Sequence, residues 1–136
     1  MEILKVYVNI TETNEVISEN TTIRMILFDG YCTGDFFNGT ILNGGVDTQM
    51  TSADQRTTLS ARYMLQGHDS KNNPCHLFIE NNAEAGKGIT YTKPKIYTDS
   101  SDLKWMEKAE LIGRIADEEG KLVIIIDKAD NKAESV

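Results

Sequence analysis

Glycine spacing between residues 29 and 49 is the feature that most constrains the fold of this chain. Half of its ten glycines lie in this stretch: Gly30, Gly34, Gly39, Gly44 and Gly45. Glycine costs conformational entropy in a strand, so it is usually placed where the backbone bends, bulges or is closely approached. Aromatic and β-branched residues separate these glycines. The pattern predicts short strands that bend sharply, as in the wall of a small, strongly curved β-barrel.

Alternating hydrophobicity predicts strands along most of the chain. Residues 3–11 show the pattern most clearly, because every second residue from Leu4 to Ile10 is apolar. Further strands are predicted at 16–17, 21–28, 36–42, 46–50, 57–66, 75–81, 89–97, 111–116 and 122–127. The one helical candidate, residues 99–107, is too short for more than one or two turns.

The arrangement of these strands predicts the fold class. Turn signals at intervals of about eight to twelve residues are typical of an all-β sandwich or barrel. The end strands, 3–11 and 122–127, are both long and apolar. As open edges they would promote aggregation, whereas pairing with each other closes the sheet. We expect one domain: a closed or nearly closed antiparallel β-barrel of about nine strands with one short helical turn, ordered over residues 3–127 and frayed over residues 128–136.

Charge and composition exclude several classes of partner. The formal net charge is −7, which repels a nucleic-acid backbone and an anionic membrane surface. No apolar run approaches the roughly 20 residues of a spanning helix, and the N-terminus lacks the basic and apolar regions of a secretory signal. We therefore expect a cytoplasmic protein, with Cys32 and Cys75 as free thiols.

Three stretches of the chain resemble the family catalogued as domain of unknown function 3237. The first is the glycine ladder that ends in Gly44-Gly-Val-Asp47, and the others are residues 59–65 and 91–106. The resemblance covers roughly residues 3–127. It implies a compact antiparallel β-barrel that often self-associates, and it implies no established activity.

Self-association is also favoured by the apolar run from Leu122 to Ile126. The two faces of this strand cannot both point into one barrel core. We expect one face to be covered by another chain, or by the helical turn near Trp105. Together with the resemblance, this predicts a homo-oligomer.

The residues that could hold a metal or act as a nucleophile are few. His76 and Glu80 share one strand face, but the H-x-H pair of a cupin-like site is absent. Two histidines, His68 and His76, are few for zinc or iron. No G-x-S-x-G motif occurs, and Cys32 and Cys75 have no obvious base partner. We therefore expect no metal and no cofactor.

Strand register decides the surroundings of Asp47. One turn geometry after residue 52 places Asp47 opposite Arg62, where the pair would form a cross-strand ion pair. A loop one residue longer places Asp47 opposite Tyr63 instead. Contact with Arg62 would lower the pKa of Asp47, whereas burial without a cation would raise it.

The second register predicts a ligand site. Continued through a loop centred between residues 70 and 71, it sets Tyr63 opposite Phe78. One wall then carries the candidate ligand-binding residues Asp47, Tyr63, His76 and Glu80. Ala61, Leu65 and Phe78 surround them, and an apolar wall with a few convergent polar groups is typical of small-molecule sites. The competing register moves the polar groups outside and makes Met64, Leu77 and Ile79 the core, because a one-residue slip turns every side chain over.

Three functions from different classes remain open. The first is a barrel that binds a small metabolite in its interior. The second is a cofactor-free acid/base enzyme of isomerase or lyase type, with Asp47 or Glu80 as general base beside Tyr63. The third is an oligomeric interaction module with a filled core. An open cavity inside the barrel would separate the first two functions from the third.

Overall fold

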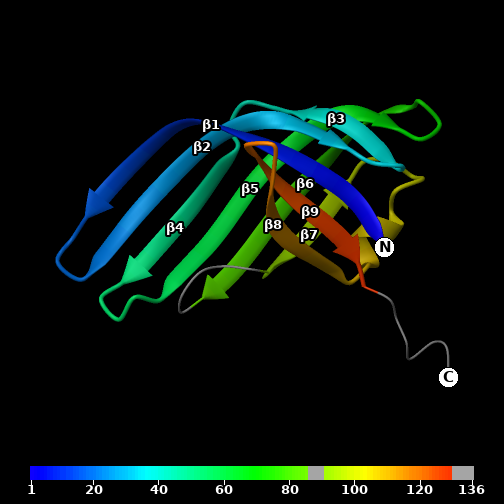
Figure 1. The fold of residues 1–136 in the computed structure, drawn as a ribbon. Helices are drawn as coiled ribbons and strands as arrows, with labels where there is room; N and C mark the ends of the chain where they lie inside the picture. Colours follow the sequence, from blue (N-terminus) through cyan, green and yellow to red (C-terminus); the bar gives the residue numbers. More distant parts are fainter. Residues whose placement is uncertain (86–90, 130–136) are drawn as a thin grey trace, which may run out of the picture.

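The structure, a computed structural model, describes residues 1–85 and 91–129. Within these ranges the chain forms strands and one short helix (Figure 1). They are β1 (Glu2–Ile17), β2 (Thr21–Thr33), β3 (Phe37–Ile41), β4 (Val46–Ser52), β5 (Thr57–Asp69), β6 (Pro74–Ala85), β7 (Tyr91–Thr98), α1 (Trp105–Lys108), β8 (Leu111–Glu118) and β9 (Lys121–Lys128). No helix in the described ranges is long and apolar enough to cross a lipid bilayer.

The strands form one antiparallel sheet that closes into an eight-stranded barrel with one extra strand. The order runs from β1 through β9, β8, β7 and β6 to β5, and returns to β1 through β2. β3 and β4 share the position between β5 and β2. β4 pairs with the first half of β5, residues 57–62, and β3 pairs with residues 65–69. The predicted all-β barrel fold is therefore confirmed.

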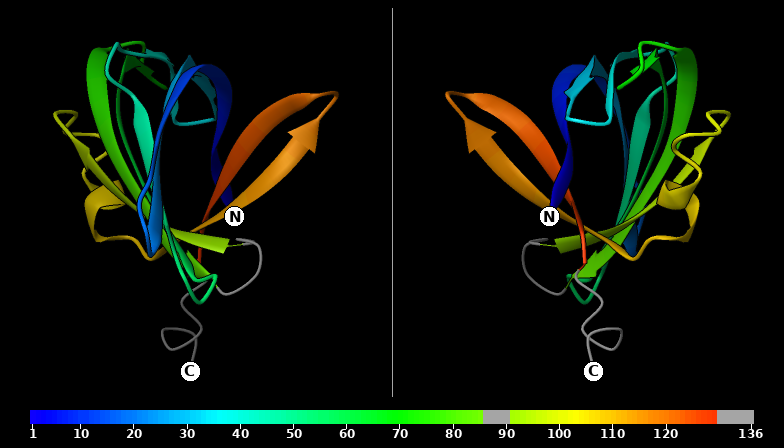
Figure 2. Two further views of the ribbon diagram at one scale, coloured as in Figure 1. Left: turned by 90° about the vertical axis from the view of Figure 1, so that its left-hand side faces the viewer. Right: turned by 90° about the vertical axis from the view of Figure 1, so that its right-hand side faces the viewer.

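Pairing of the two ends of the chain closes the barrel, as the apolar end strands predict. Residues 2–8 of β1 pair with residues 122–127 of β9. Beyond Val8, β1 continues as a hairpin with β2. The β8–β9 hairpin, drawn in orange in Figure 2, diverges from β1 toward its tip. In the described ranges, two register pairs join β8 to β7: Tyr91 with Arg114 and Thr92 with Gly113.

Several strands are longer than predicted because sheet pairing continues through polar residues. Residues 16–17 are the end of β1 rather than a separate strand, and they pair with the start of β2. β6 extends through residues 82–85, predicted as a loop, because they pair with residues 57–60 of β5. The remainder of that loop, the start of the strand predicted at 89–97 and most of the tail lie outside the described residues.

The helical segment is shorter than predicted. Only residues 105–108 are helical, and no side chain caps them, so the predicted helix over 99–107 is wrong at its start. The segment nevertheless packs onto the barrel. Met106 and Leu103 are buried in the core, and the Trp105 ring lies edge-on to Phe36 with 5.0 Å between ring centroids.

Two glycines of the ladder show why the backbone needs them. Gly30 has φ +143°, and a β-carbon there would lie 1.9 Å from the carbonyl oxygen of Tyr7 on β1. Gly44 has φ +110° in the turn before β4, a conformation that L side chains rarely adopt. The ladder therefore marks close strand approach and sharp turning, as predicted.

Large side chains fill one half of the barrel interior. The half that contains β3 and α1 is packed by fully buried side chains that include Phe37, Leu65, Leu77, Met106 and Ile126. The other half, beside β4, contains a cavity. The interior is thus filled at one end and hollow at the other.

The outer face of β9 is covered within the single chain. Val123 and Ile125 alternate with cavity-lining residues and so point outward, yet they are 0% and 5% exposed. Their cross-strand neighbours on β1 are Tyr7 and Lys5. Covering this face therefore needs no second chain, so it gives no argument for self-association. Self-association stays a prediction, supported by the resemblance alone.

Candidate functional site

The β4–β5 hairpin sets the position of Asp47. Asp47 lies opposite Ala61, not opposite Arg62 or Tyr63, so both predicted registers are wrong. The cause is a three-residue turn over residues 53–55, closed by a 2.9 Å hydrogen bond from the Ser52 N–H to the Arg56 carbonyl. Asp47 nevertheless shares the inner face with Tyr63, because residues two apart on β5 point to the same side.

The β5–β6 hairpin places the other two predicted residues outside the barrel. Tyr63 lies opposite Ile79 rather than Phe78, so His76 and Glu80 share the outer face. The turn has three residues, 70–72, and Asp69 Oδ1 accepts hydrogen bonds from the backbone N–H groups of Lys71 and Asn73. The predicted common wall of four polar residues is therefore wrong for His76 and Glu80.

The outer-face residues have partners of their own. Glu80 forms an ion pair with Arg62 at 3.3 Å. His76 is bound to Asp99, with 2.8 Å between Nδ1 and Oδ2. These contacts use the side chains that the predicted ligand-site register would have placed on the same wall as Asp47. Of the four predicted residues, the structure brings together only Asp47 and Tyr63.

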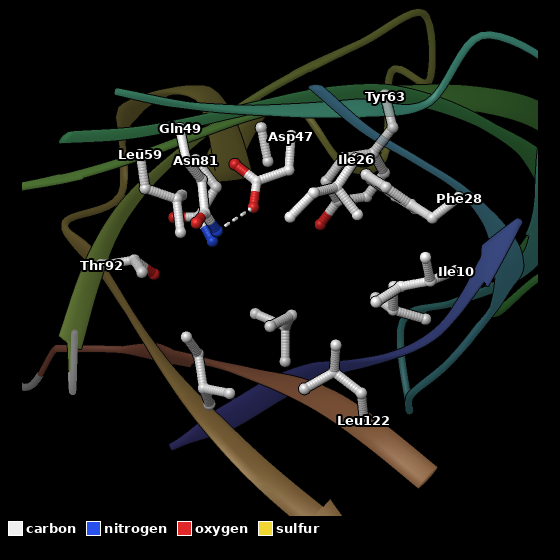
Figure 3. A pocket seen from close by; sticks show the side chains of 14 residues that line it. Ile10, Ile26, Phe28, Asp47, Gln49, Leu59, Tyr63, Asn81, Thr92 and Leu122 are labelled. Carbon is white, nitrogen blue, oxygen red and sulfur yellow. Dashed lines mark hydrogen bonds between the residues drawn. The ribbon is translucent and has the colours of Figure 1, made fainter. Parts of the chain in front are cut away.

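A cavity of about 220 Å³ occupies the hollow half of the barrel. Every strand except β3 contributes to its lining (Figure 3). Most of the lining is apolar: Phe28 and Ile26 come from β2, and Leu122 and Ile124 from β9. In Figure 3, Asp47, Gln49 and Asn81 lie on one side of the cavity and Leu122 lies across from them. The cavity therefore has a polar side and an apolar side.

Four polar side chains of the cavity wall have an oxygen without a hydrogen-bond partner. Five buried side-chain oxygens in the described residues lack a partner, and four of them line this cavity. They are Asp47 Oδ1, Tyr63 Oη, Asn81 Oδ1 and Thr92 Oγ1. Because buried polar groups are nearly always hydrogen-bonded, such a cluster calls for an explanation.

The electrostatics of the cavity centre on Asp47. Burial raises the pKa of its carboxyl above the usual value, and a hydrogen bond from Gln49 Nε2 to Oδ2, 2.9 Å long, partly opposes that shift. Among the described residues that line the cavity, Asp47 is the only one with a charged side chain. Burial also raises the pKa of the Tyr63 hydroxyl, which keeps it a neutral donor.

Asn81 and Thr92 were not predicted as site residues. Asn81 continues the alternation of Leu77 and Ile79 on the inner face of β6, and it is 3% exposed. Extending that alternation by one step beyond the apolar residues would have placed an amide inside the barrel. Thr92 alternates with Pro94 and Ile96 on β7 and follows the same rule.

Metal and thiol chemistry have little support in the described residues. The described residues contain no group of three or more His, Cys, Asp or Glu side chains that could hold a metal ion. Cys32 and Cys75 are free and buried, and burial raises the pKa of the Cys32 thiol to about 12. A thiol with a raised pKa is a poor nucleophile because the thiolate is the reactive form.

Comparison with known proteins identifies the family. The family model described as "Protein of unknown function (DUF3237)" matches residues 3–84, more than half of the chain. The chain belongs to the DUF3237 family. The matched residues of this DUF3237 chain contain Asp47, Tyr63 and Asn81, whereas Thr92 and the apolar residues of β8 and β9 follow the match.

Three known proteins are similar to this DUF3237 chain. A UPF0311 protein from Clostridium acetobutylicum is 32% identical over 111 residues, which span 68% of this chain and 66% of that protein. A solved structure of a protein with unknown function from the same species has a TM-score of 0.78 and 21% identity, and covers 96% of this chain and 95% of its own. A structure described as an enzyme from Penicillium herquei has a TM-score of 0.73 and 15% identity, and the match covers 93% of this chain and 92% of that one. The two structural likenesses show a shared fold.

Proposed function

We propose that the protein binds a small, largely apolar molecule inside the hollow half of the barrel. The observation that carries this proposal is the cluster of four partnerless oxygens around one apolar cavity. A buried polar group without a partner costs roughly 1–3 kcal/mol. A ligand that hydrogen-bonds to these oxygens regains that free energy, and its apolar part gains from contact with the apolar side.

The packed half of the barrel supports the same proposal. There the chain fills the interior with large side chains such as Phe37 and Met106. In the hollow half it places Ala61 at the centre of the wall, between Asp47 and Asn81. Cavities in a core destabilise a protein. A cavity kept next to a well-filled core is therefore better explained by a ligand than by poor packing.

Acid/base catalysis is the second candidate, favoured by the state of Asp47. A carboxylate with a raised pKa in the wall of a cavity is suited to act as a general base. The neutral Tyr63 hydroxyl could donate a hydrogen bond to a developing negative charge. The Penicillium herquei structure described as an enzyme supports this candidate by analogy of fold alone. Glu80, on the outer face, is not a candidate base. An ordinary pKa for Asp47 in an NMR titration would remove this candidate.

Binding in the cavity can be tested with benzyl alcohol as a probe and with Ala61→Leu. The larger side chain would occupy the space between Asp47 and Asn81. We expect benzyl alcohol to shift the amide signals of cavity-lining residues in the wild-type protein and not in Ala61→Leu. The measurement is a titration followed by ¹H–¹⁵N NMR, with Ala61→Val as a milder variant should the leucine disturb folding.

The matched control is Ala53→Leu, in the exposed turn between β4 and β5. This variant should bind the probe as the wild-type protein does. If benzyl alcohol shifts the cavity signals equally in Ala61→Leu, the probe does not bind in the cavity.

A further inference from the structure

Asp47, Ala61 and Asn81 lie side by side across three neighbouring strands. Asp47 of β4 is opposite Ala61 of β5, and Ala61 is opposite Asn81 of β6. Adjacent strands are about 4.8 Å apart, so the backbones that carry the two polar side chains are about 10 Å apart. In strand register, Ala61 is the residue between them. This arrangement leaves room for a ligand group that contacts both side chains.

Both side chains present a buried acceptor. Asp47 Oδ1 and Asn81 Oδ1 have no hydrogen-bond partner in the described part of the chain. The other carboxylate oxygen of Asp47 accepts a hydrogen bond from Gln49, which favours the charged form. A ligand group that fits between them must therefore donate hydrogen bonds.

The carboxylate also lacks a counter-charge. Charged groups that are removed from water are normally paired with an opposite charge. No described residue that lines the cavity is cationic. Arg62, the cation nearest to Asp47 in strand register, belongs to the outer face and pairs with Glu80. A positive charge in the cavity would have to come from the ligand.

The rest of the cavity indicates what surrounds that charge. Phe28 and Tyr63 lie edge to face in the wall, with 5.3 Å between ring centroids, and aromatic faces attract cations. Leu122 and Ile124 close the opposite side and favour an apolar body.

We propose that the ligand is a small apolar amine whose ammonium group binds between Asp47 and Asn81. This inference rests on the proposed function and adds the chemical class of the ligand. An ammonium group supplies several donors and a positive charge at once.

Other ligand chemistries fit the cavity less well. An anion would be repelled by Asp47. A bare metal ion such as Ca²⁺ requires six to eight oxygen ligands, which a mostly apolar lining does not supply. A neutral alcohol could donate one hydrogen bond but would leave the carboxylate without a counter-charge.

Three probes of similar size separate these possibilities. Benzylamine, benzyl alcohol and benzoate share a phenyl ring and differ in the charge of the head group. We expect benzylamine to bind at least about tenfold more tightly than benzyl alcohol at neutral pH, and benzoate to bind most weakly. Calorimetry or NMR titration measures the three dissociation constants.

Two matched variants test the role of the carboxylate. Asp47→Asn removes the charge inside the cavity, and Glu80→Gln removes a carboxylate from the outer face. Asp47→Asn should remove the preference for the amine over the alcohol, because the cavity then offers the ammonium group no opposite charge. Glu80→Gln should retain the full preference.

The outcomes distinguish this inference from the proposed function. If benzyl alcohol binds as tightly as benzylamine, and Ala61→Leu abolishes binding, the amine inference is overturned and the binding function stands. Persistence of the amine preference in Asp47→Asn overturns the inference as well. If none of the three probes binds, both proposals fall.

Discussion

Asp47 has one carboxylate oxygen held by Gln49 and a second, fully buried oxygen that has no partner in the described chain. A residue selected for stability alone would not be placed this way, because a buried charge without a counter-charge destabilises the folded state. Sites that bind or transform ligands commonly accept such a cost, since the same group interacts strongly with what enters the cavity. At the scale of single residues, Asp47 is therefore the strongest indication of function.

Replacement of the Asp47 carboxyl should change the free energy of unfolding by an amount that depends on pH. Burial raises the folded-state pKa of Asp47 above its ordinary value of 3.8, so the folded chain holds the proton more tightly than the unfolded chain. As the pH rises from 3.8 through the folded-state pKa, Asp47 lowers the free energy of unfolding, and the full penalty remains above that range.

Asp47→Asn should therefore be more stable than the wild type at neutral pH, and the difference should vanish below pH 3.8. Urea unfolding of both proteins across this range measures the effect. A less stable variant at neutral pH, or a difference that does not change with pH, would show that burial does not raise the pKa of Asp47.

At the scale of elements, the sequence predicted the strands better than their registers. Alternation located most strands, and the two apolar end strands correctly indicated closure. The registers failed at two turns that each contain three residues. Gln55 and Asn72 adopt φ of 69° and 65° in these turns, although neither is the glycine that usually marks such a position. Turn length was therefore not readable from residue type.

A register error of two residues keeps a side chain on its predicted face, whereas an error of one residue moves it to the other face. This difference explains which site residues were predicted correctly. The predicted register with Tyr63 opposite Asp47 differs from the observed one by two residues on β5, which keeps side chains on the same face. The predicted β5–β6 register differs by one residue, which turned His76 and Glu80 outward and Asn81 inward. The sequence therefore correctly predicted that Asp47 and Tyr63 share one wall, and it did not predict Asn81 on that wall.

Closure predicts a specific pattern of amide exchange. Residues 5–8 of β1 are paired on both sides, with β2 and β9. Their amides should exchange slowly, because they are released only when the barrel opens. Residues 13–16 of β1, which among the described residues pair with β2 alone, should exchange faster. Hydrogen exchange followed by NMR measures both segments, and fast exchange throughout residues 5–8 would contradict closure.

At the scale of the whole molecule, the barrel combines a packed half with a hollow half. The packed half holds the strands in place through side chains such as Phe37, Leu77 and Met106. The hollow half carries the polar groups and the cavity. This division lets the fold tolerate a cavity and a half-buried carboxylate at one end, because the other end supplies a well-filled core. Composition alone could not show it, since both halves are built from apolar, alternating strands.

The central claim, that this half is hollow, is tested most directly by filling it. Ala61→Leu in an Asp47→Asn background adds apolar volume to the cavity without burying a charge further. If the space is empty, the added side chain should raise the free energy of unfolding by roughly 1 kcal/mol relative to Asp47→Asn alone. If the interior is already filled, overpacking should lower it by about 1–3 kcal/mol. Urea unfolding of the two chains therefore decides the question by the sign of one difference: an increase is predicted, and a decrease would contradict the account.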